Sequence, residues 1–294
     1  MEDIQQIVFQ NLQQIRSVRA QRYRSVIFTF KDIRESFIYN ELGKIHEFIS
    51  EAGRDRINRG RKSLETIEEC IQYWFTYCKS FVPKPWKDLA KRYEKLQMHQ
   101  QPVEIYDYAS GQGQATILLL DHFYGNQNKN KIIAINLVEK SAFALNIAKE
   151  ILKNHSPEIS SQKINLIIQD INQIELKEFD IKAGPYKIHL FSQILVMGVV
   201  DGKRLLEKIL SIPGRHFIWA VSQNSNYEKI NINSKTNISY FKEFYNELEM
   251  QIESNPTIEK KSEIYQIDLH EATLKLQDGQ EKPYIIFGRY ITIK

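Results

Sequence analysis

Cysteine is scarce in this chain of 294 residues, and long apolar runs are missing. Cys70 and Cys78 are too few for a disulfide framework or a structural zinc site, and their spacing in one helical stretch favours buried thiols. No window approaches the roughly 18 consecutive apolar residues of a membrane-spanning helix. The acidic, polar N-terminus also lacks the basic and apolar blocks of a signal peptide. We therefore expect a cytoplasmic protein with no membrane anchor and no metal site.

Charge of one sign is not in large excess either. The formal net charge is +4, which permits a nucleic-acid partner without requiring one. A hydrophobic content of 42% beside 26% charged residues is that of a globular protein. The length suffices for one large domain or two smaller ones.

The first hundred residues have helical periodicity and no strand-like alternation. Apolar residues recur at spacings of three and four from residue 2 to residue 51, and a glycine-containing loop follows at 53–62. Ser63 is a candidate N-cap for a second helix that ends before Pro83, and a third helix is expected over 86–98. We predict a helical N-terminal domain or extension over residues 1–100.

From residue 101 to residue 294, short β-rich runs alternate with helical stretches, as in βαβ units with a parallel sheet. Near the end, two strand-like runs face each other across residues 277–280, which indicates a hairpin. The prediction is an α/β fold with five wound strands and two more joined as a hairpin. The expected strands are VEIYD, KIIAINLV, INLIIQ, KIHLFS, HFIWAVS, SEIYQIDLHEATLKL and PYIIFGRYITIK.

Glycine is also sparse, yet Gly111 and Gly113 stand one residue apart in the turn between the first strand and a helix at 115–123. Such turns bind ligands in open α/β sheets, because small residues allow close approach and the helix N-terminus offers free N–H groups. The second strand ends at Glu139 and the third at Asp170. These carboxylates could accept hydrogen bonds from a nucleoside ligand, or could be unrelated solvated groups.

The pattern resembles the class I S-adenosylmethionine-dependent methyltransferases, whose sheet has seven strands with an antiparallel last strand. Their first motif is roughly acid-x-Gly-x-Gly-x-Gly, and this sequence has Asp107-x-Ala109-x-Gly111-x-Gly113. Alanine at the first small position departs from the motif, and the resemblance covers only residues 101–294. It implies a fold, a doubly wound seven-stranded sheet, and a cofactor, S-adenosylmethionine. The cofactor-binding residues that it implies are Asp107, Ala109, Ser110, Gly111 and Gly113 at the methionine end, Glu139 at the ribose, and Asp170 with Ile171 at the adenine.

A nicotinamide dinucleotide site is the alternative for this loop. Its fingerprint needs a third glycine, where this sequence has Thr116. It also does not usually carry an acid four residues before its first glycine, and the methyltransferase motif does. The methyltransferase interpretation is therefore favoured.

The acceptor side of the site is less clear in the sequence. In the family, residues after the fourth strand usually act on the acceptor, which here points to Ser192 and Gln193 as catalytic candidates. Asn224 follows the fifth strand at the same edge of the sheet and is a substrate-binding candidate. Ser192 and Gln193 could instead simply terminate the strand. His189 is expected in the core. The motif of DNA amine methyltransferases is missing, and no cysteine after Cys78 could attack cytosine.

Two basic clusters in the N-terminal region could bind phosphates, or could be solvated surfaces. RNA is therefore the first expectation for the methyl acceptor, ahead of a small molecule or a protein. The alternative is an inactive methyltransferase-like binding module in a nucleic-acid-processing or defence complex, with a protein partner on the N-terminal helices. The two clusters contain Arg16, Arg19, Arg22, Arg24, Arg54, Arg56, Arg59, Arg61 and Lys62.

Overall fold

The structure is a computed structural model of the full chain. It describes residues 62–66, 69–70, 73, 83–95, 101–125, 131–156, 159, 161–175, 185–223, 237–260, 266–275 and 281–294. The predicted helices before residue 62, Cys78, Asn224 and all of the basic clusters except Lys62 lie outside this part. No helix within it is long and apolar enough to cross a membrane.

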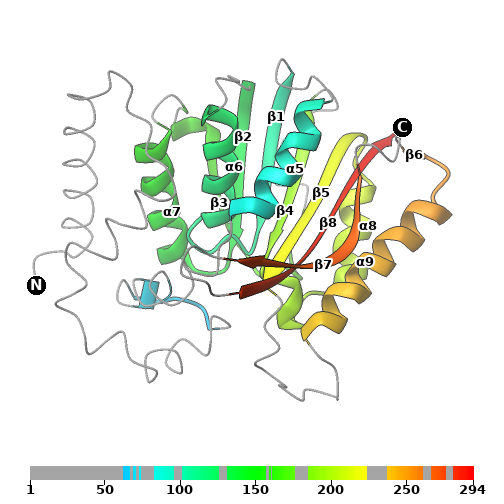
Figure 1. Cartoon of the computed structure of the whole chain (residues 1–294). Helices are drawn as coiled ribbons and strands as arrows, with labels where there is room; N and C mark the ends of the chain where they lie inside the picture. The colour runs from blue at the N-terminus through cyan, green and yellow to red at the C-terminus, as the bar shows by residue number, and fades with distance from the viewer. Residues whose placement is uncertain are drawn as a thin grey trace, which may run out of the picture.

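Eight strands form one mixed sheet in the order β3-β2-β1-β4-β5-β8-β6, with β7 also beside β8 (Figure 1). The neighbouring pairs among β1 to β5 are parallel, and β8 runs antiparallel to β5. The strands are β1 (Pro102–Tyr108), β2 (Lys131–Glu139), β3 (Ile164–Ile168), β4 (Tyr186–Ser192), β5 (Gly214–Gln223), β6 (Ile258–Lys260), β7 (Ile267–Lys275) and β8 (Glu281–Ile293).

The two extra C-terminal strands occupy one position of the sheet. β6 pairs with the end of β8 from Ile291 to Ile293, and β7 pairs with the part of β8 from Glu281 to Gly288. β6 and β7 are thus successive halves of a sixth strand, and the sheet has seven positions with an antiparallel last strand. This is the sheet of the class I methyltransferase fold, so the predicted fold class is confirmed. β7 begins at Ile267, within the strand predicted over 262–276, and β6 was not predicted; residues 262–265 lie outside the described part of the chain.

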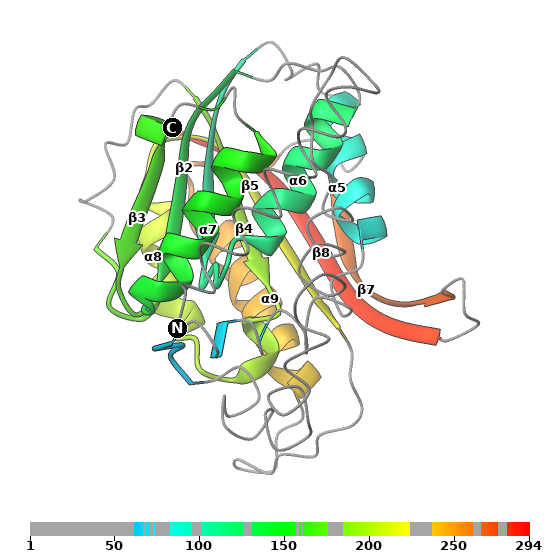
Figure 2. The same cartoon turned by 90° about the vertical axis from the view of Figure 1, so that its left-hand side faces the viewer.

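Helices cover both faces of the sheet, as a doubly wound fold requires (Figures 1 and 2). α5 (Pro83–Lys95), α6 (Gln114–Gly125) and α7 (Ala142–His155) pack on one face, and α8 (Gly202–Leu210) and α9 (Asn237–Ser254) on the other. In β1, Val103 and Ile105 enter the first core and Tyr106 and Tyr108 the second. The strand contributes apolar side chains to both faces because both are buried.

The described residues before the sheet belong to the same core. Leu64, Cys70 and Trp86 are buried among side chains of α6 and α7, which confirms the buried thiol at Cys70. α5 lies so close to β8 that a Cβ on Gly288 would meet Leu89 Cδ2 at 2.6 Å. This part of the N-terminal region therefore packs on the sheet.

Two predicted helix starts in this region were wrong. The Thr66 hydroxyl accepts from the Glu69 N–H at 3.2 Å and the Thr66 carbonyl accepts from the Cys70 N–H, so Thr66 is the N-cap, and Ser63 is not. α5 begins at Pro83, three residues before the predicted start. Proline is well tolerated in the first helical turn, where its missing N–H has no partner to lose.

A chain of buried hydrogen bonds crosses β1, β4 and β5. His216 Nε2 lies 2.9 Å from the Ile212 carbonyl, so this nitrogen carries the hydrogen and Nδ1 accepts from His189 Nε2 at 3.0 Å. His189 Nδ1 must then accept from the Tyr108 hydroxyl, also at 3.0 Å. Burial lowers the pKa of His216 to about 3 and that of His189 well below its usual value. Both rings are neutral core residues, as predicted for His189.

Candidate cofactor site

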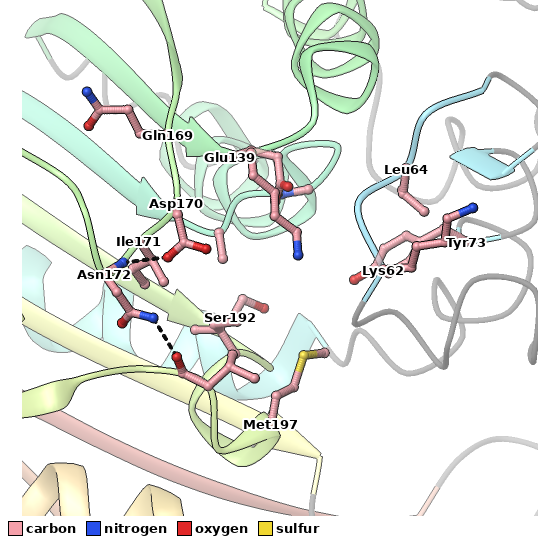
Figure 3. A pocket seen from close by; sticks show the side chains of 15 residues that line it. Lys62, Leu64, Tyr73, Glu139, Gln169, Asp170, Ile171, Asn172, Ser192 and Met197 are labelled. Atoms are coloured by element: carbon pink, nitrogen blue, oxygen red, sulfur yellow. Dashed lines mark hydrogen bonds between the residues drawn. The ribbon is translucent and has the colours of Figure 1, made fainter.

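A cavity of about 240 Å³ lies at the carboxyl ends of β1 to β4 (Figure 3). Among the predicted site residues, those that line it are Ala109, Gly111, Glu139, Asp170, Ile171 and Ser192. The structure thus brings together side chains from four successive strand ends. Asp107, Ser110, Gly113 and Gln193 are described by the structure but do not line the cavity.

The loop after β1 has three residues in the left-handed region, with φ of 51° at Ala109, 53° at Gly111 and 77° at Gly113. Glycine adopts this conformation without steric cost, whereas alanine is strained by about 1 kcal/mol or more. Gly111 faces the cavity. Gly113 has a structural role, because a Cβ there would lie 3.4 Å from Ala148 Cβ on α7. Ser110 N–H donates to the Val138 carbonyl at 2.9 Å, which ties the loop to β2.

Asp107 lies beneath this loop and is 1% exposed. Its Oδ2 accepts from both the N–H and the hydroxyl of Thr116 in the first turn of α6, at 3.3 and 2.7 Å. Its Oδ1 is buried without a hydrogen-bond partner in the structure. Burial, with a smaller contribution from the nearby Glu139 carboxylate, raises the pKa of Asp107 to about 7, against the effect of the Thr116 hydrogen bonds. Asp107 therefore holds the loop and the helix together and has one oxygen to spare.

Glu139 ends β2 with its carboxylate at the cavity wall. Oε2 accepts from the Gly111 N–H at 3.2 Å, and Oε1 accepts from the Ser141 N–H at 3.1 Å. Burial raises the pKa of Glu139, and these two hydrogen bonds oppose the rise. Each carboxylate oxygen can accept a second hydrogen bond, so the group can still bind a pair of hydroxyls.

The loop after β3 is fastened to the loop after β4. Asp170 Oδ1 accepts from the Asn172 N–H at 2.9 Å (Figure 3). The Asn172 side chain donates to the Val199 carbonyl and accepts from the Asp201 N–H, both at 2.7 Å. One asparagine thus fixes the wall formed by residues 197–199 relative to the Asp170 carboxylate.

The two catalytic candidates differ in position. Ser192 lines the cavity, and its buried Oγ has no hydrogen-bond partner in the structure. Gln193 has a φ of 62°, and its Oε1 accepts from the Gln223 N–H at 2.9 Å. The Gln193 side chain thereby joins the ends of β4 and β5, which is a structural task.

Sequence reasoning missed several lining residues. Gln169 and Asn172 flank Asp170, and Lys140 follows Glu139, so their positions after strands were a usable signal. Three further lining residues follow β4: Ile194, Met197 and Val199. Another three come from the N-terminal region: Lys62, Leu64 and Tyr73. Lys62 was predicted only as part of a basic cluster, and no local pattern marks Leu64 or Tyr73, because they reach the cavity through the tertiary fold alone.

The residues present fit S-adenosylmethionine. The cavity has one carboxylate suited to ribose hydroxyls, Glu139, and a second at the next strand end, Asp170. Asp107 Oδ1 and Ser110 Oγ are buried beside the glycine loop without partners in the structure, and such groups are usually satisfied by a ligand or water. The described residues contain no group of His, Cys, Asp or Glu that could hold a metal ion.

Comparisons with solved structures find methyltransferases. A plantazolicin methyltransferase in complex with S-adenosylhomocysteine aligns over 90% of this chain and 96% of its own, with 13% identity and a TM-score of 0.44. An S-adenosylmethionine-dependent methyltransferase from Leishmania major aligns over 88% and 91%, with 10% identity and a TM-score of 0.40. An rRNA methylase from Streptococcus thermophilus aligns over 71% and 98%, with 13% identity and a TM-score of 0.37. No protein-family model and no curated protein matches the sequence. Likeness at this level does not extend to function, which has to be argued from the chain's own residues.

Proposed function

We propose that the chain binds S-adenosylmethionine in the cavity at the carboxyl ends of β1 to β4 and transfers its methyl group to an acceptor. The observation that carries this is the joint placement of Glu139 and Asp170 around a cavity closed by the loop at Gly111. A ligand with vicinal hydroxyls, an amino-substituted base and a cationic end matches these groups. Glu139 would accept from the ribose, Asp170 from the adenine amino group, and the glycine loop would bind the methionine end.

The cofactor supplies a methyl group already activated on a sulfonium, so the protein needs mainly to align donor and acceptor. Ser192 lines the cavity, and its buried Oγ has no hydrogen-bond partner in the structure. Ile194 and Met197 form an apolar surface next to it, which would exclude water from the transfer.

Glu139→Gln is expected to weaken S-adenosylhomocysteine binding at least tenfold. The neutral amide keeps one acceptor oxygen where the carboxylate has two, and its NH₂ group cannot accept, so it cannot serve the Gly111 and Ser141 N–H groups and two hydroxyls together. Tenfold corresponds to about 1.4 kcal/mol. Isothermal titration calorimetry on the full chain, freed of carried-over cofactor, measures both dissociation constants. The matched control is Glu150→Gln on α7, whose carboxylate pairs with Lys153 at 2.5 Å on the surface. Failure of the wild-type chain to bind, or equal affinities for all three proteins, would contradict the proposal.

RNA is our proposal for the acceptor class. It is supported by the basic clusters of the N-terminal region, of which Lys62 lines the cavity. Transfer of labelled methyl to total RNA, compared with protein and with small-molecule extracts, tests it.

A binding module without catalysis is the second candidate. The observation in its favour is that the Gln193 side chain is engaged by the Gln223 backbone and is not turned toward the cavity. Such a module would bind S-adenosylhomocysteine and be weakened by Glu139→Gln, yet would transfer no methyl group to any acceptor class.

A further inference from the structure

One wall of the cavity does not come from the sheet. We name it the N-terminal wall: the described residues 62–66, 69–70 and 73. Lys62, Leu64 and Tyr73 line the cavity opposite the strand ends, and Figure 3 shows Leu64 and Tyr73 across from Glu139 and Ser192. Each lies well before β1, outside residues 101–294, which carry the sequence motifs that resemble those of methyltransferases.

Two buried side chains fasten this wall to the two loops that would hold the cofactor. Gln112 stands between Gly111 and Gly113, and its Nε2 donates to the Cys70 carbonyl at 2.8 Å. Ser141 follows Glu139 by two residues, and its hydroxyl donates to the Leu64 carbonyl. Gln112 is 0% and Ser141 3% exposed, so neither hydrogen bond competes with bulk water.

The wall is also ordered within itself. Lys62 Nζ pairs with Glu69 Oε1 at 2.6 Å, and Glu69 Oε2 accepts from the Glu65 N–H at 2.7 Å. The Glu69 N–H in turn donates to the Thr66 hydroxyl. Thr66 therefore caps the turn that contains Glu69, and the Glu69 carboxylate reaches back to both the Glu65 backbone and the Lys62 side chain.

Tyr73 lies directly against the glycine loop. A Cβ placed on Gly111 would be 3.9 Å from Tyr73 Cε1, which is van der Waals contact. The ring therefore lies beside the loop, and both Tyr73 and Gly111 line the cavity. An aromatic ring in this place would bury the apolar part of whatever ligand lies over Gly111.

From these contacts we propose that the N-terminal wall is part of the cofactor site, with Tyr73 as a ligand-contacting residue and Gln112 as a positioning residue. The proposal rests on the function proposed above. Because Gln112 and Ser141 sit within the two cofactor loops, docking of the wall and binding of the cofactor stabilise each other. By linkage this coupling is reciprocal: bound cofactor favours docking of the wall by the same factor by which the docked wall raises the affinity for the cofactor.

Hydrogen exchange on the wild-type full chain tests the coupling. Saturating S-adenosylhomocysteine is expected to slow exchange of the described wall amides about fivefold or more, which requires only about 1 kcal/mol of coupling. By calorimetry, Tyr73→Ala is expected to weaken S-adenosylhomocysteine binding about five- to tenfold, in the range of a lost aromatic contact. Tyr73→Phe, which keeps the ring, is the control and should stay within about twofold of wild type.

The outcomes separate this inference from the proposed function. If wild type binds and Glu139→Gln weakens binding, but the wall amides exchange unchanged, the wall is no part of the site and the function stands. A folded Tyr73→Ala variant that binds S-adenosylhomocysteine with wild-type affinity would also overturn the inference about the wall. If wild type does not bind at all, both fail. Should Tyr73→Ala not fold, the exchange result on the wild-type chain decides alone.

Discussion

Asp107→Asn is expected to make the protein more stable above neutral pH and a weaker binder of S-adenosylmethionine. The substitution keeps an acceptor for the Thr116 N–H and hydroxyl, which Asp107 binds at 3.3 and 2.7 Å. It removes a carboxylate that is fully buried with one oxygen unpartnered. At pH 8 we expect the free energy of unfolding to rise by about 1–3 kcal/mol, measured by urea denaturation.

The stability that Asp107→Asn gains should depend on pH in a defined direction. Burial raises the pKa of Asp107 to about 7 in the folded state, against roughly 4 in the unfolded chain. Between these values the folded state binds more protons, so the contribution of Asp107 to stability falls as the pH rises from about 4 to about 7. The difference between the variant and wild type should therefore be small near pH 4 and reach its full size above pH 7.

The same substitution should lower the affinity for the cofactor. S-adenosylmethionine carries an ammonium group and a sulfonium, and a buried carboxylate beneath the loop stabilises positive charge above it. We expect Asp107→Asn to weaken binding of S-adenosylmethionine at least tenfold at pH 8. Binding of S-adenosylhomocysteine, which lacks the sulfonium charge, should weaken by less. Asp88→Asn, on the surface and paired with Lys84 at 3.1 Å, is the control and should change neither property. An unstabilised variant with wild-type affinity would contradict this role for Asp107.

The two loop glycines should fail in different ways when each is replaced by valine. Both substitutions carry backbone strain of about 1–2 kcal/mol, since φ is 53° at Gly111 and 77° at Gly113. At Gly111 a Cβ would meet its neighbours at 3.7 and 3.9 Å, which is ordinary contact, and the side chain would enter the cavity. Gly111→Val should therefore fold and lose S-adenosylhomocysteine binding by at least about a hundredfold, a loss of about 2.7 kcal/mol.

Gly113→Val should instead damage the fold. Its Cβ would lie 3.4 Å from Ala148 Cβ, and the added methyl groups would push α6 away from α7. Overpacking together with strain predicts a loss of about 2–5 kcal/mol of unfolding free energy. Gly113→Ala combined with Ala148→Gly should recover part of the stability that Gly113→Ala alone loses. Equal stabilities for the two valine variants would show that this division of roles is mistaken.

The sequence was sufficient to predict the sheet and the acids at its edge. Glu139 and Asp170 were found because parallel strands end at one edge, so a residue following a strand can be placed without knowing its contacts. The division of the sixth strand into β6 and β7 could not be seen, because β6 has only three residues and no alternation of its own. The N-cap residue Thr66 was visible in the sequence, but Ser63 gave a competing signal nearby.

Residues that depend on tertiary contacts were out of reach. Tyr73 belongs to a stretch rich in aromatics, and only the packing of that stretch on Gly111 puts one of its rings at the cavity. Asp107 was expected within the cofactor loop, whereas the structure buries it against Thr116 beneath that loop. Gln193 was placed correctly at the strand end. Its side chain, however, accepts a hydrogen bond from the Gln223 N–H at the end of β5, which is distant in sequence.

The central claim is that the cavity at the ends of β1 to β4 holds S-adenosylmethionine. The most direct test is a crystal structure of the full chain with S-adenosylhomocysteine. We predict ribose hydroxyls within hydrogen-bonding distance of Glu139, the adenine beside Asp170, and the homocysteine end over Gly111 against Tyr73. Ligand bound elsewhere on the protein, or a cavity that stays empty at saturating ligand, would contradict the claim.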